Sequence, residues 1–441
     1  MARDLDPVLS DDVLPERADV VVIGGGVIGV ATAMFLAEEG QTVVLCEKGE
    51  IAGEQSSRNW GWCRAMGRDP RELPLILESL KLWRGMNARI GAETGFRQIG
   101  TLYLCKDEAA LEKRVAWTAH AKAHGLNSIV LRGGEVAQAL EGTADQWVGA
   151  LHTPTDGVAE PSMAVPAMAK YARSQGAVLL QNCAVRGVER TAGRLSAVVT
   201  EKGTIRCDRA VLAGGAWSGL FARSLGLRLP QLKVLASVQR TAAVNHGPPM
   251  ASWGPGLAQR KRLDGGYNVS HGHVVAQITP DSFRYFKEFL PLLRMEWDTV
   301  SLKFGKSFFE ERELHRPWAL DGISPFEKVR VLDPTPDAAD LAEGRAQLER
   351  SFPAFKGVPT LASWGGMIDS TPDTVPVISA VDQIPGLIIA TGFSGHGFGI
   401  GPGAGRLVAD LASGKEPLVD PTPFRFSRFS DGSLIRPVTG V

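Results

Sequence analysis

An excess of charge of either sign is missing from this chain, and cysteine is scarce. Lys and Arg together number 48, Asp and Glu together also number 48, and no basic run stands out. Because nucleic-acid binding needs clustered positive charge, no nucleic-acid partner is expected. The five cysteines, at positions 46, 63, 105, 183 and 207, are odd in number and lack metal-ligand spacing. Free thiols in a reducing compartment are the interpretation that fits.

Long apolar runs are also lacking. No window reaches the ~18 uninterrupted apolar residues of a membrane helix, so no membrane partner is predicted. Residues 1–18 are acidic, contain proline and lack the apolar core of a signal peptide, so they are expected to form a short leader. The protein is therefore predicted to be soluble and cytoplasmic, and a homo-oligomer is left open. At 441 residues, two domains are expected.

One stretch near the N-terminus gives the strongest indication of fold and function. Four apolar β-formers at 20–23 predict a strand buried on both faces. A G-x-G-x-x-G motif beginning at Gly24 then opens a helix that Gly40 ends. A second buried strand at 42–46 delivers Glu47 at its carboxyl end. This order of strand, glycine turn, helix, strand and acid is typical of a dinucleotide site rather than of an ordinary βαβ turn.

Each part of this stretch answers a need of a bound dinucleotide. Gly24 permits the tight turn, Gly26 lets the backbone approach the pyrophosphate, and Gly29 lets the helix lie close to the sheet. The helix N-terminus offers N–H groups and partial positive charge to the phosphates. Glu47 can accept the ribose hydroxyls of an adenosine. The predicted contact residues here are Gly24, Gly26, Val27, Ile28, Gly29, Glu47 and Lys48.

The segment from Lys48 to Arg64 looks too polar and too rich in glycine for regular structure, and it follows the nucleotide stretch directly. Small and forked donors suit a pyrophosphate, and tryptophans could wall a flat ring. The alternative is a structural surface loop with a tucked tryptophan. The residues predicted to contact the cofactor in this loop are Ser56, Ser57, Arg58, Asn59, Gly61 and Trp62.

The middle of the chain alternates between helix-like and strand-like patterns. Helical spacing at 73–90 is followed by a strand-like run at 96–105 and a charged helix at 106–124. Short strands from residue 177 onward end in a buried strand that returns the chain to the first sheet. Residues 232–330 should supply the substrate side of the pocket. Three further cofactor contacts are predicted in the returning strands: Val185 near the adenine, Ala213 and Gly214.

A second glycine-dense turn lies near the C-terminus. The strand 386–391 leads into Gly392–Gly405, and a helix is expected over 406–412. Backbone N–H groups at a helix start can stabilise the negative charge that a reduced flavin carries. A turn that serves packing alone is the alternative. The predicted flavin contacts are Gly395, His396, Gly397, Phe398 and Gly399.

Taken together, these motifs resemble the FAD-dependent D-amino-acid oxidase, glycine oxidase and sarcosine oxidase superfamily. The likeness also includes the stretches at 213–218 and 364–376. It implies an α/β protein with a Rossmann-like FAD-binding domain and a second α+β substrate domain built on an antiparallel sheet. The implied FAD domain is discontinuous and comprises residues 16–90, 150–230 and 357–441. The implied substrate domain comprises residues 91–149 and 231–356.

The resemblance also implies an enzyme and its chemistry. The Cα–N bond of an α-amino acid, with an L-amino acid slightly preferred, would be oxidised to an imino acid, which water converts to a 2-oxo acid and ammonia. O2, reduced to H2O2, or another electron acceptor would take the electrons. Oxidation of a secondary amine (an N-alkyl amino acid, imino acid or opine), a 2-hydroxy-acid dehydrogenase and a non-enzymatic FAD protein remain alternatives.

Relatives that bind flavin covalently use a late cysteine or a histidine in the early loop. Here no cysteine follows Cys207 and residues 56–64 contain no histidine, so FAD is expected to be noncovalent. Some relatives activate oxygen with a lysine on the substrate sheet. Residues 266–277 contain no lysine, which leaves oxidase and dehydrogenase both open.

A small carboxylated amine as substrate calls for a forked arginine. The candidates are Arg64 and Arg316, although either could instead form a surface or structural ion pair. Tyr267 and Trp364 are candidates for the pocket wall, with a place in the core as the alternative. His396 is expected to polarise the flavin edge rather than to abstract a proton.

Overall fold

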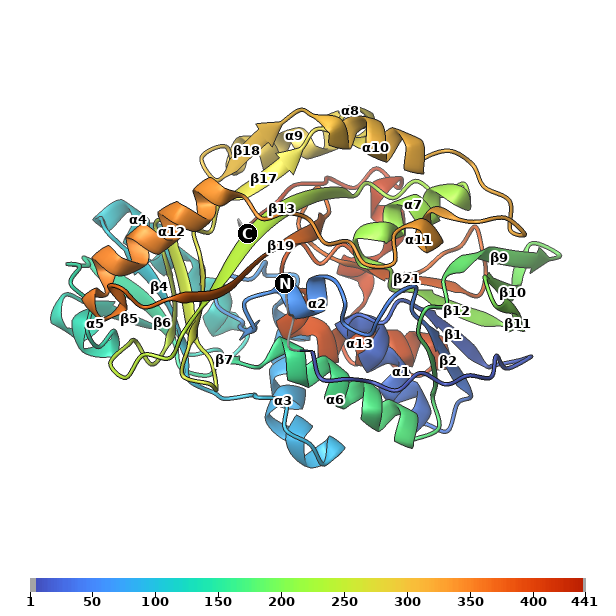
Figure 1. Cartoon of the computed structure of the whole chain (residues 1–441), viewed down its shortest axis with the longest axis horizontal. Coiled ribbons are helices and arrows are strands. Elements are labelled where there is room, and N and C mark those ends of the chain that lie inside the picture. Colours follow the sequence, from blue (N-terminus) through green and yellow to red (C-terminus); the bar gives the residue numbers. More distant parts are fainter. Residues whose placement is uncertain (1–4, 439–441) are drawn as a thin grey trace.

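The computed structural model describes residues 5–438, in which a six-stranded and a ten-stranded sheet lie on opposite sides of the molecule (Figure 1). The smaller sheet has the order β20-β21-β12-β1-β2-β8, with β1 parallel to both β12 and β2. All four residues of β1 are buried, as predicted. The strand bounds are β1 Val20–Ile23, β2 Val43–Cys46, β8 Val178–Leu180, β12 Arg209–Leu212, β20 Val377–Ala380 and β21 Leu387–Thr391.

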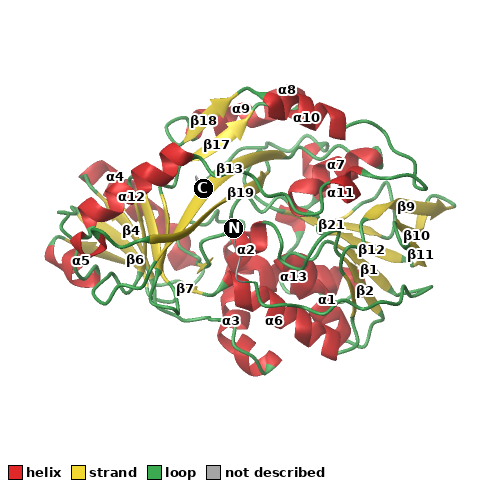
Figure 2. Cartoon of the chain, in the orientation of Figure 1, coloured by secondary structure: helices red, strands yellow, loops and turns green. Residues whose placement is uncertain are grey.

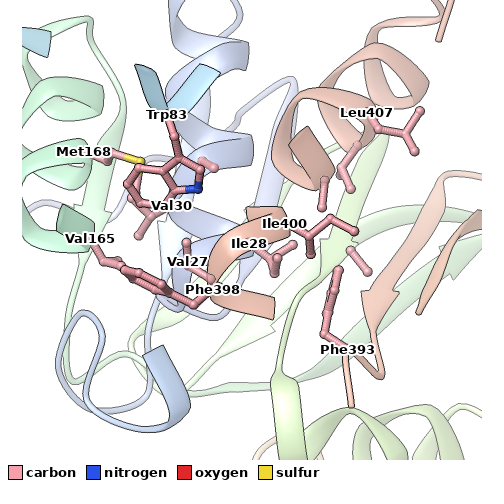
Figure 3. Packing of buried hydrophobic residues seen from close by; sticks show 14 of the residues in the cluster. Val27, Ile28, Val30, Trp83, Val165, Met168, Phe393, Phe398, Ile400 and Leu407 are labelled. Carbon is pink, nitrogen blue, oxygen red and sulfur yellow. The ribbon is translucent and has the colours of Figure 1, made fainter. Parts of the chain in front are cut away.

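Four helices pack together beside this sheet: α1 (Val27–Glu38), α3 (Leu73–Ile90), α6 (Pro161–Ser174) and α13 (Gly397–Ser413). Figure 3 shows part of the apolar core that they share with the sheet. The start predicted for α13 was wrong, because the helix begins at Gly397 and not at residue 406. Glycine is a poor helix former, but here it permits close packing. A Cβ on Gly405 would lie 2.4 Å from the Cβ of Ala31 in α1.

The larger sheet runs β18-β17-β13-β16-β15-β14-β4-β6-β5, and β19 also pairs with β13. The expected antiparallel sheet is in fact mixed, because β14 is parallel to β4 and β18 is parallel to β17. The glycine-rich residues 263–266 form the turn of a hairpin between β15 and β16, which pair antiparallel. The bounds are β4 Thr101–Cys105, β5 Ile129–Arg132, β6 Gly149–Thr153, β13 Leu232–Thr241, β14 Ala251–Gly254, β15 Leu257–Lys261, β16 Tyr267–Ser270, β17 Val274–Gln277, β18 Val300–Lys303 and β19 Thr360–Ser370.

Several helices connect and cover the large sheet. The charged helix predicted at 106–124 is confirmed as α4 (Glu108–Ala123), whereas the sequence patterns did not reveal the others. Figure 2 shows α8 (Pro280–Arg284), α9 (Phe286–Met295) and α10 (Lys306–Leu314) gathered beside β17 and β18. The other helices are α5 Gly134–Ala139, α7 Ser218–Ser224, α11 Pro325–Lys328 and α12 Ala338–Ser351. No helix in the described part of the chain is both long and apolar enough to cross a membrane.

The loop after Glu47 has more structure than expected. It contains the short helix α2 (Gln55–Arg58) and the strand β3 (Trp62–Cys63), which pairs with β7 (Gly157–Val158). The returning strands form a separate three-stranded sheet made of β9 Val185–Thr191, β10 Arg194–Thr200 and β11 Gly203–Arg206. The early loop is therefore anchored by the pairing of β3 with β7.

Candidate functional site

A cavity of about 530 Å³ lies where the two large sheets face each other. One wall comes from the ends of β1, β2 and β12 and from the starts of α1 and α13. The opposite wall comes from β13, β17, β18 and the helices α8 and α9. Chain segments far apart in the sequence therefore meet around one space.

The first glycine turn has the close contacts that a nucleotide-binding turn requires. Gly24 has φ +113°, and a Cβ on it would lie 2.4 Å from the carbonyl oxygen of Ala213. A Cβ on Gly29 would lie 2.0 Å from the carbonyl oxygen of Gly24, so α1 could not approach the strand with any larger residue there. Gly29 itself does not line the cavity, whereas Gly24, Gly26, Val27 and Ile28 do.

Glu47 lies in the cavity wall at the end of β2. Its carboxylate accepts hydrogen bonds of 2.7 Å each from the backbone N–H groups of Gly25 and Gly49, while burial raises its pKa. Lys48 also lines the cavity, but its ammonium is bonded to Glu54 at 2.6 Å. Val185 lies in the same wall. An acid anchored by backbone donors keeps further lone pairs for ribose hydroxyls.

The residues of the early loop divide into two groups. Ser56, Arg58, Asn59 and Trp62 line the cavity, and the Ser56 hydroxyl accepts the N–H of Val27 at 2.8 Å. The Arg58 guanidinium is bonded to Asp333 at 2.5 Å, yet its Nη2 is buried without a partner. Two predicted contacts, Ser57 and Gly61, do not line the cavity; a Cβ on Gly61 would lie 2.4 Å from the carbonyl oxygen of Ala159.

All five residues predicted in the second glycine turn line the cavity. Gly395 has φ +82°, and His396 is the N-cap of α13. A Cβ on Gly399 would lie 2.9 Å from the carbonyl oxygen of Trp62, so the helix start is pressed against the early loop. The start of α13 therefore presents its backbone to the cavity, whereas Phe398 also packs against Trp83 with ring centroids 5.3 Å apart (Figure 3).

Among the four residues predicted for the substrate, only Arg64 lines the cavity. Its Nη1 donates to the carbonyl oxygen of Met66 at 2.5 Å. Arg316 has a side chain that is 74% exposed and pairs with Glu313, outside the cavity. Tyr267 is fully buried in the core, and the Trp364 indole N–H donates to the carbonyl oxygen of Arg58 at 2.9 Å. Tyr267 is therefore a core residue, whereas Trp364 supports the early loop through its bond to Arg58.

Arg68 was not recognised from the sequence, although it follows Arg64 by four residues. It lines the cavity and is 3% exposed. Burial, together with the charge of Arg64, lowers its pKa to about 9. In the described part of the chain, no ion pair joins either guanidinium to a carboxylate, and Nη1 of Arg68 has no hydrogen-bond partner. Both buried cations thus line the cavity without a direct ion pair, although the nearby carboxyl groups of Glu72 and Asp156 act on Arg68 through their charge.

Another wall of the cavity is largely apolar, although Gln277, Ser282 and Glu296 also line it. It is made mainly of residues from β17, α8, α9 and β18, which lie within the segment 232–330 that was expected to supply the substrate side of the pocket. An aromatic cluster in a segment expected to form the substrate side was the only signal. The wall residues are Ile278, Phe283, Phe286, Phe289, Leu290, Leu293, Val300 and Leu302.

The fold and this cavity define a dinucleotide-binding oxidoreductase. FAD fits the residues present, since a glycine cradle and an anchored acid lie at one part of the cavity and a second helix start lies at another. The profile of the FAD dependent oxidoreductase family matches residues 19–411. The chain belongs to that family, and FAD is its cofactor.

Known relatives agree with this assignment. The L-amino acid deaminase of Proteus myxofaciens, solved in complex with anthranilate, is 36% identical with a TM-score of 0.93, over 97% of this chain and 96% of that one. Glycine oxidase of Pseudomonas putida is 26% identical over 92% of this chain and 97% of its own length. Sarcosine oxidase subunit beta of Rhizobium meliloti is 28% identical over 95% and 89%.

Proposed function

We propose that the protein oxidises the Cα–N bond of α-amino acids with apolar side chains, with L-amino acids preferred. The products are a 2-oxo acid and ammonia, and O2 or another acceptor takes the electrons. One observation carries the proposal: Arg64 and Arg68 line the cavity without a direct ion pair, and a largely apolar wall lines the same cavity. The likeness to the L-amino acid deaminase of Proteus myxofaciens supports it.

The two arginines form the carboxylate site. Burial lowers the pKa of Arg68, and repulsion from the charge of Arg64 lowers it further. A bound carboxylate removes this repulsion and accepts a pair of parallel N–H bonds from a fork. Arg64 is held in one orientation by the Met66 carbonyl and by the rings of Trp62 and Tyr103, at 5.7 and 5.2 Å. The arginines therefore fix the substrate as well as attract it.

The apolar wall selects the side chain. Burying apolar surface is worth about 25 cal/mol per Å², or about 0.8 kcal/mol for each methylene group. Phe283, Phe286 and Phe289 come from two consecutive helices and surround one part of the cavity. We expect leucine, methionine and phenylalanine to be better substrates than glycine or aspartate.

FAD supplies the two-electron acceptor when it is bound. The chain itself orients the α-carbon by holding the carboxylate and the side chain at different walls.

The test compares Arg64 and Arg316, the two arginines that the sequence offered equally as carboxylate-binding residues. Arg64→Leu should raise the KM for L-leucine or L-phenylalanine by about 10- to 100-fold, because a charged bidentate contact is lost. Arg316→Leu is the matched control and should leave KM unchanged, since Arg316 lies outside the cavity. Both enantiomers are assayed for flavin reduction, ammonia and 2-oxo acid. An unchanged KM in Arg64→Leu would remove the carboxylate site from the proposal.

A secondary-amine oxidase is the second candidate, favoured by the 28% identity to sarcosine oxidase subunit beta over 95% of this chain. The same assays separate the two functions by their nitrogen product. Ammonia from a primary amino acid supports deamination, whereas an alkylamine or aldehyde from an N-methyl amino acid supports the alternative.

A further inference from the structure

A buried carboxyl group lies directly behind the cavity. Oε2 of Glu72, the residue before α3, lies 3.5 Å from Nδ1 of His396, and the two side chains are 0% and 3% exposed. Neither oxygen of Glu72 nor Nδ1 of His396 has a hydrogen-bond partner. His396 lines the cavity, and because Nδ1 is the buried nitrogen, Nε2 is the one available to a ligand. The imidazole thus connects the cavity to the buried carboxyl group.

The surrounding charges make this pair sensitive to what binds at the arginines. Burial raises the pKa of Glu72 to about 7, against the opposing effect of Arg68. Burial lowers the pKa of His396, and the charges of Arg68 and Arg64 lower it further. The other charged or titratable groups that act on this cluster are Asp69 and Arg71 on Glu72, and Tyr103 and Asp156 on Arg68.

We propose that Glu72 and His396 form a proton-accepting pair that receives the proton of the substrate ammonium when the substrate carboxylate binds to Arg64 and Arg68. The inference rests on the proposed function. In contrast to the role expected from the sequence, Nε2 of His396 accepts the ammonium proton, and the Nδ1 proton passes to Oε2 of Glu72. The amine and Glu72 end neutral, no electron moves, and no further reactant is needed.

Carboxylate binding drives this transfer through electrostatics. In the free enzyme the two arginines favour the ionised form of Glu72 and disfavour a protonated imidazole. A bound carboxylate offsets their charge, so both groups hold a proton more tightly. Binding of the substrate carboxylate thereby raises the proton affinity of the Glu72–His396 pair. The pair can then take a proton from the substrate ammonium, which leaves the neutral amine, the form from which hydride can leave.

The test measures proton uptake in the FAD-loaded enzyme. Benzoate serves as the probe, because it has a carboxylate and no amine that could release a proton of its own. Binding is followed by the change in flavin absorbance, and protons are followed with a pH indicator in weak buffer. At pH 7.5, wild-type enzyme should take up roughly half a proton per flavin. Glu72→Gln should bind benzoate and take up almost none.

Glu78→Gln is the matched control, since Glu78 lies on the same helix at the surface and pairs with Lys81. It should behave as the wild type. With L-leucine, Glu72→Gln should slow flavin reduction by about 100-fold at neutral pH, and the deficit should narrow at alkaline pH, where the amine is already neutral.

Two results would overturn the inference: wild-type enzyme that binds benzoate without proton uptake, or Glu72→Gln with undiminished uptake. If Glu72→Gln fails to hold flavin, the wild-type enzyme still provides a test, because proton uptake by Glu72 requires benzoate affinity to fall as pH rises from about 7 to 8, where Arg68, with a pKa of about 9, stays charged. An affinity independent of pH would refute the pair. Failure of the proposed function looks different, since no amino acid would then reduce the flavin at all.

Discussion

Glu72 couples the stability of the fold to pH. Its carboxyl group is fully buried without hydrogen bonds, and its pKa is raised from 4.5 to about 7. A raised pKa means that the folded state binds the proton more tightly than the unfolded chain does. The stabilisation is therefore complete below about pH 4.5 and is lost as pH rises through about 7.

Replacing Glu72 by glutamine should remove this dependence. Relative to the wild type, Glu72→Gln should gain stability as pH rises from 5 to 9, by about 3 kcal/mol, because one pKa unit corresponds to about 1.4 kcal/mol. Thermal unfolding of the FAD-loaded proteins across this range measures the difference. A difference that stays constant with pH would show that Glu72 titrates normally.

Some of the site residues could be predicted from the sequence. Arg64 could be named as a forked cation near the nucleotide loop, but so could Arg316, and only the fold separates a cavity residue from a surface one. The burial of Glu72 could not be predicted from the sequence, because a glutamate that precedes a helix is ordinarily exposed to solvent. Its partner His396 comes from a segment more than 300 residues away.

At the scale of elements, the contact between α1 and α13 is built on small residues. The Cβ that alanine would add at Gly405 would lie 2.4 Å from the Cβ of Ala31, and one at Gly403 would lie 2.8 Å from the Cβ of Ser79 in α3. Both helices begin at the cavity. Their separation therefore sets the spacing between the two glycine turns.

Gly405→Ala should destabilise the protein by about 1–3 kcal/mol and weaken FAD binding, because the added methyl group forces α13 away from α1. Gly85→Ala is the control, since Gly85 lies within α3 and a Cβ there meets nothing within 4 Å. Its better helix propensity should stabilise the protein by about 0.5–1 kcal/mol. Denaturant unfolding and FAD titration report both effects. Equal behaviour of the two variants would contradict the role given to Gly405.

The extent of α13 illustrates what local patterns miss. Glycines at 397, 399, 401, 403 and 405 predict a turn, because glycine is unfavourable in helices. Packing against α1 and α3 outweighs this preference, since only glycine allows so close an approach. By contrast, β1 and β2 were predicted within a residue or two, because strands buried on both faces are uniformly apolar.

At the scale of the whole molecule, the cofactor site joins segments that are distant in the chain. We propose that residues 16–90, 150–230 and 357–441 form the FAD domain and that residues 91–149 and 231–356 form the substrate domain. The two parts are interwoven, because β19 lies within the last FAD segment yet pairs along its length with β13 of the larger sheet. FAD bound in the cavity would therefore hold both parts together.

Loss of FAD should accordingly lower the thermal stability of the entire protein. Because the link is predicted to be noncovalent, mild denaturant or high salt should strip the flavin, and added FAD should restore a Tm several degrees higher. Ligand at 100 times its Kd contributes about 2.7 kcal/mol. Differential scanning fluorimetry measures the shift, and Glu47→Ala should reduce it through the lost ribose contact. Flavin that stays with the chain after acid precipitation would disprove the noncovalent link.

The sequence by itself determined the cofactor, because a nucleotide-binding turn is local: strand, glycines, helix and acid follow one another within some thirty residues, and each shows in its own composition. Only the tertiary structure decided which arginines meet a substrate, why α13 is rich in glycine and where Glu72 finds its partner. Those properties depend on burial and on distances between chain-remote groups, and packing sets both.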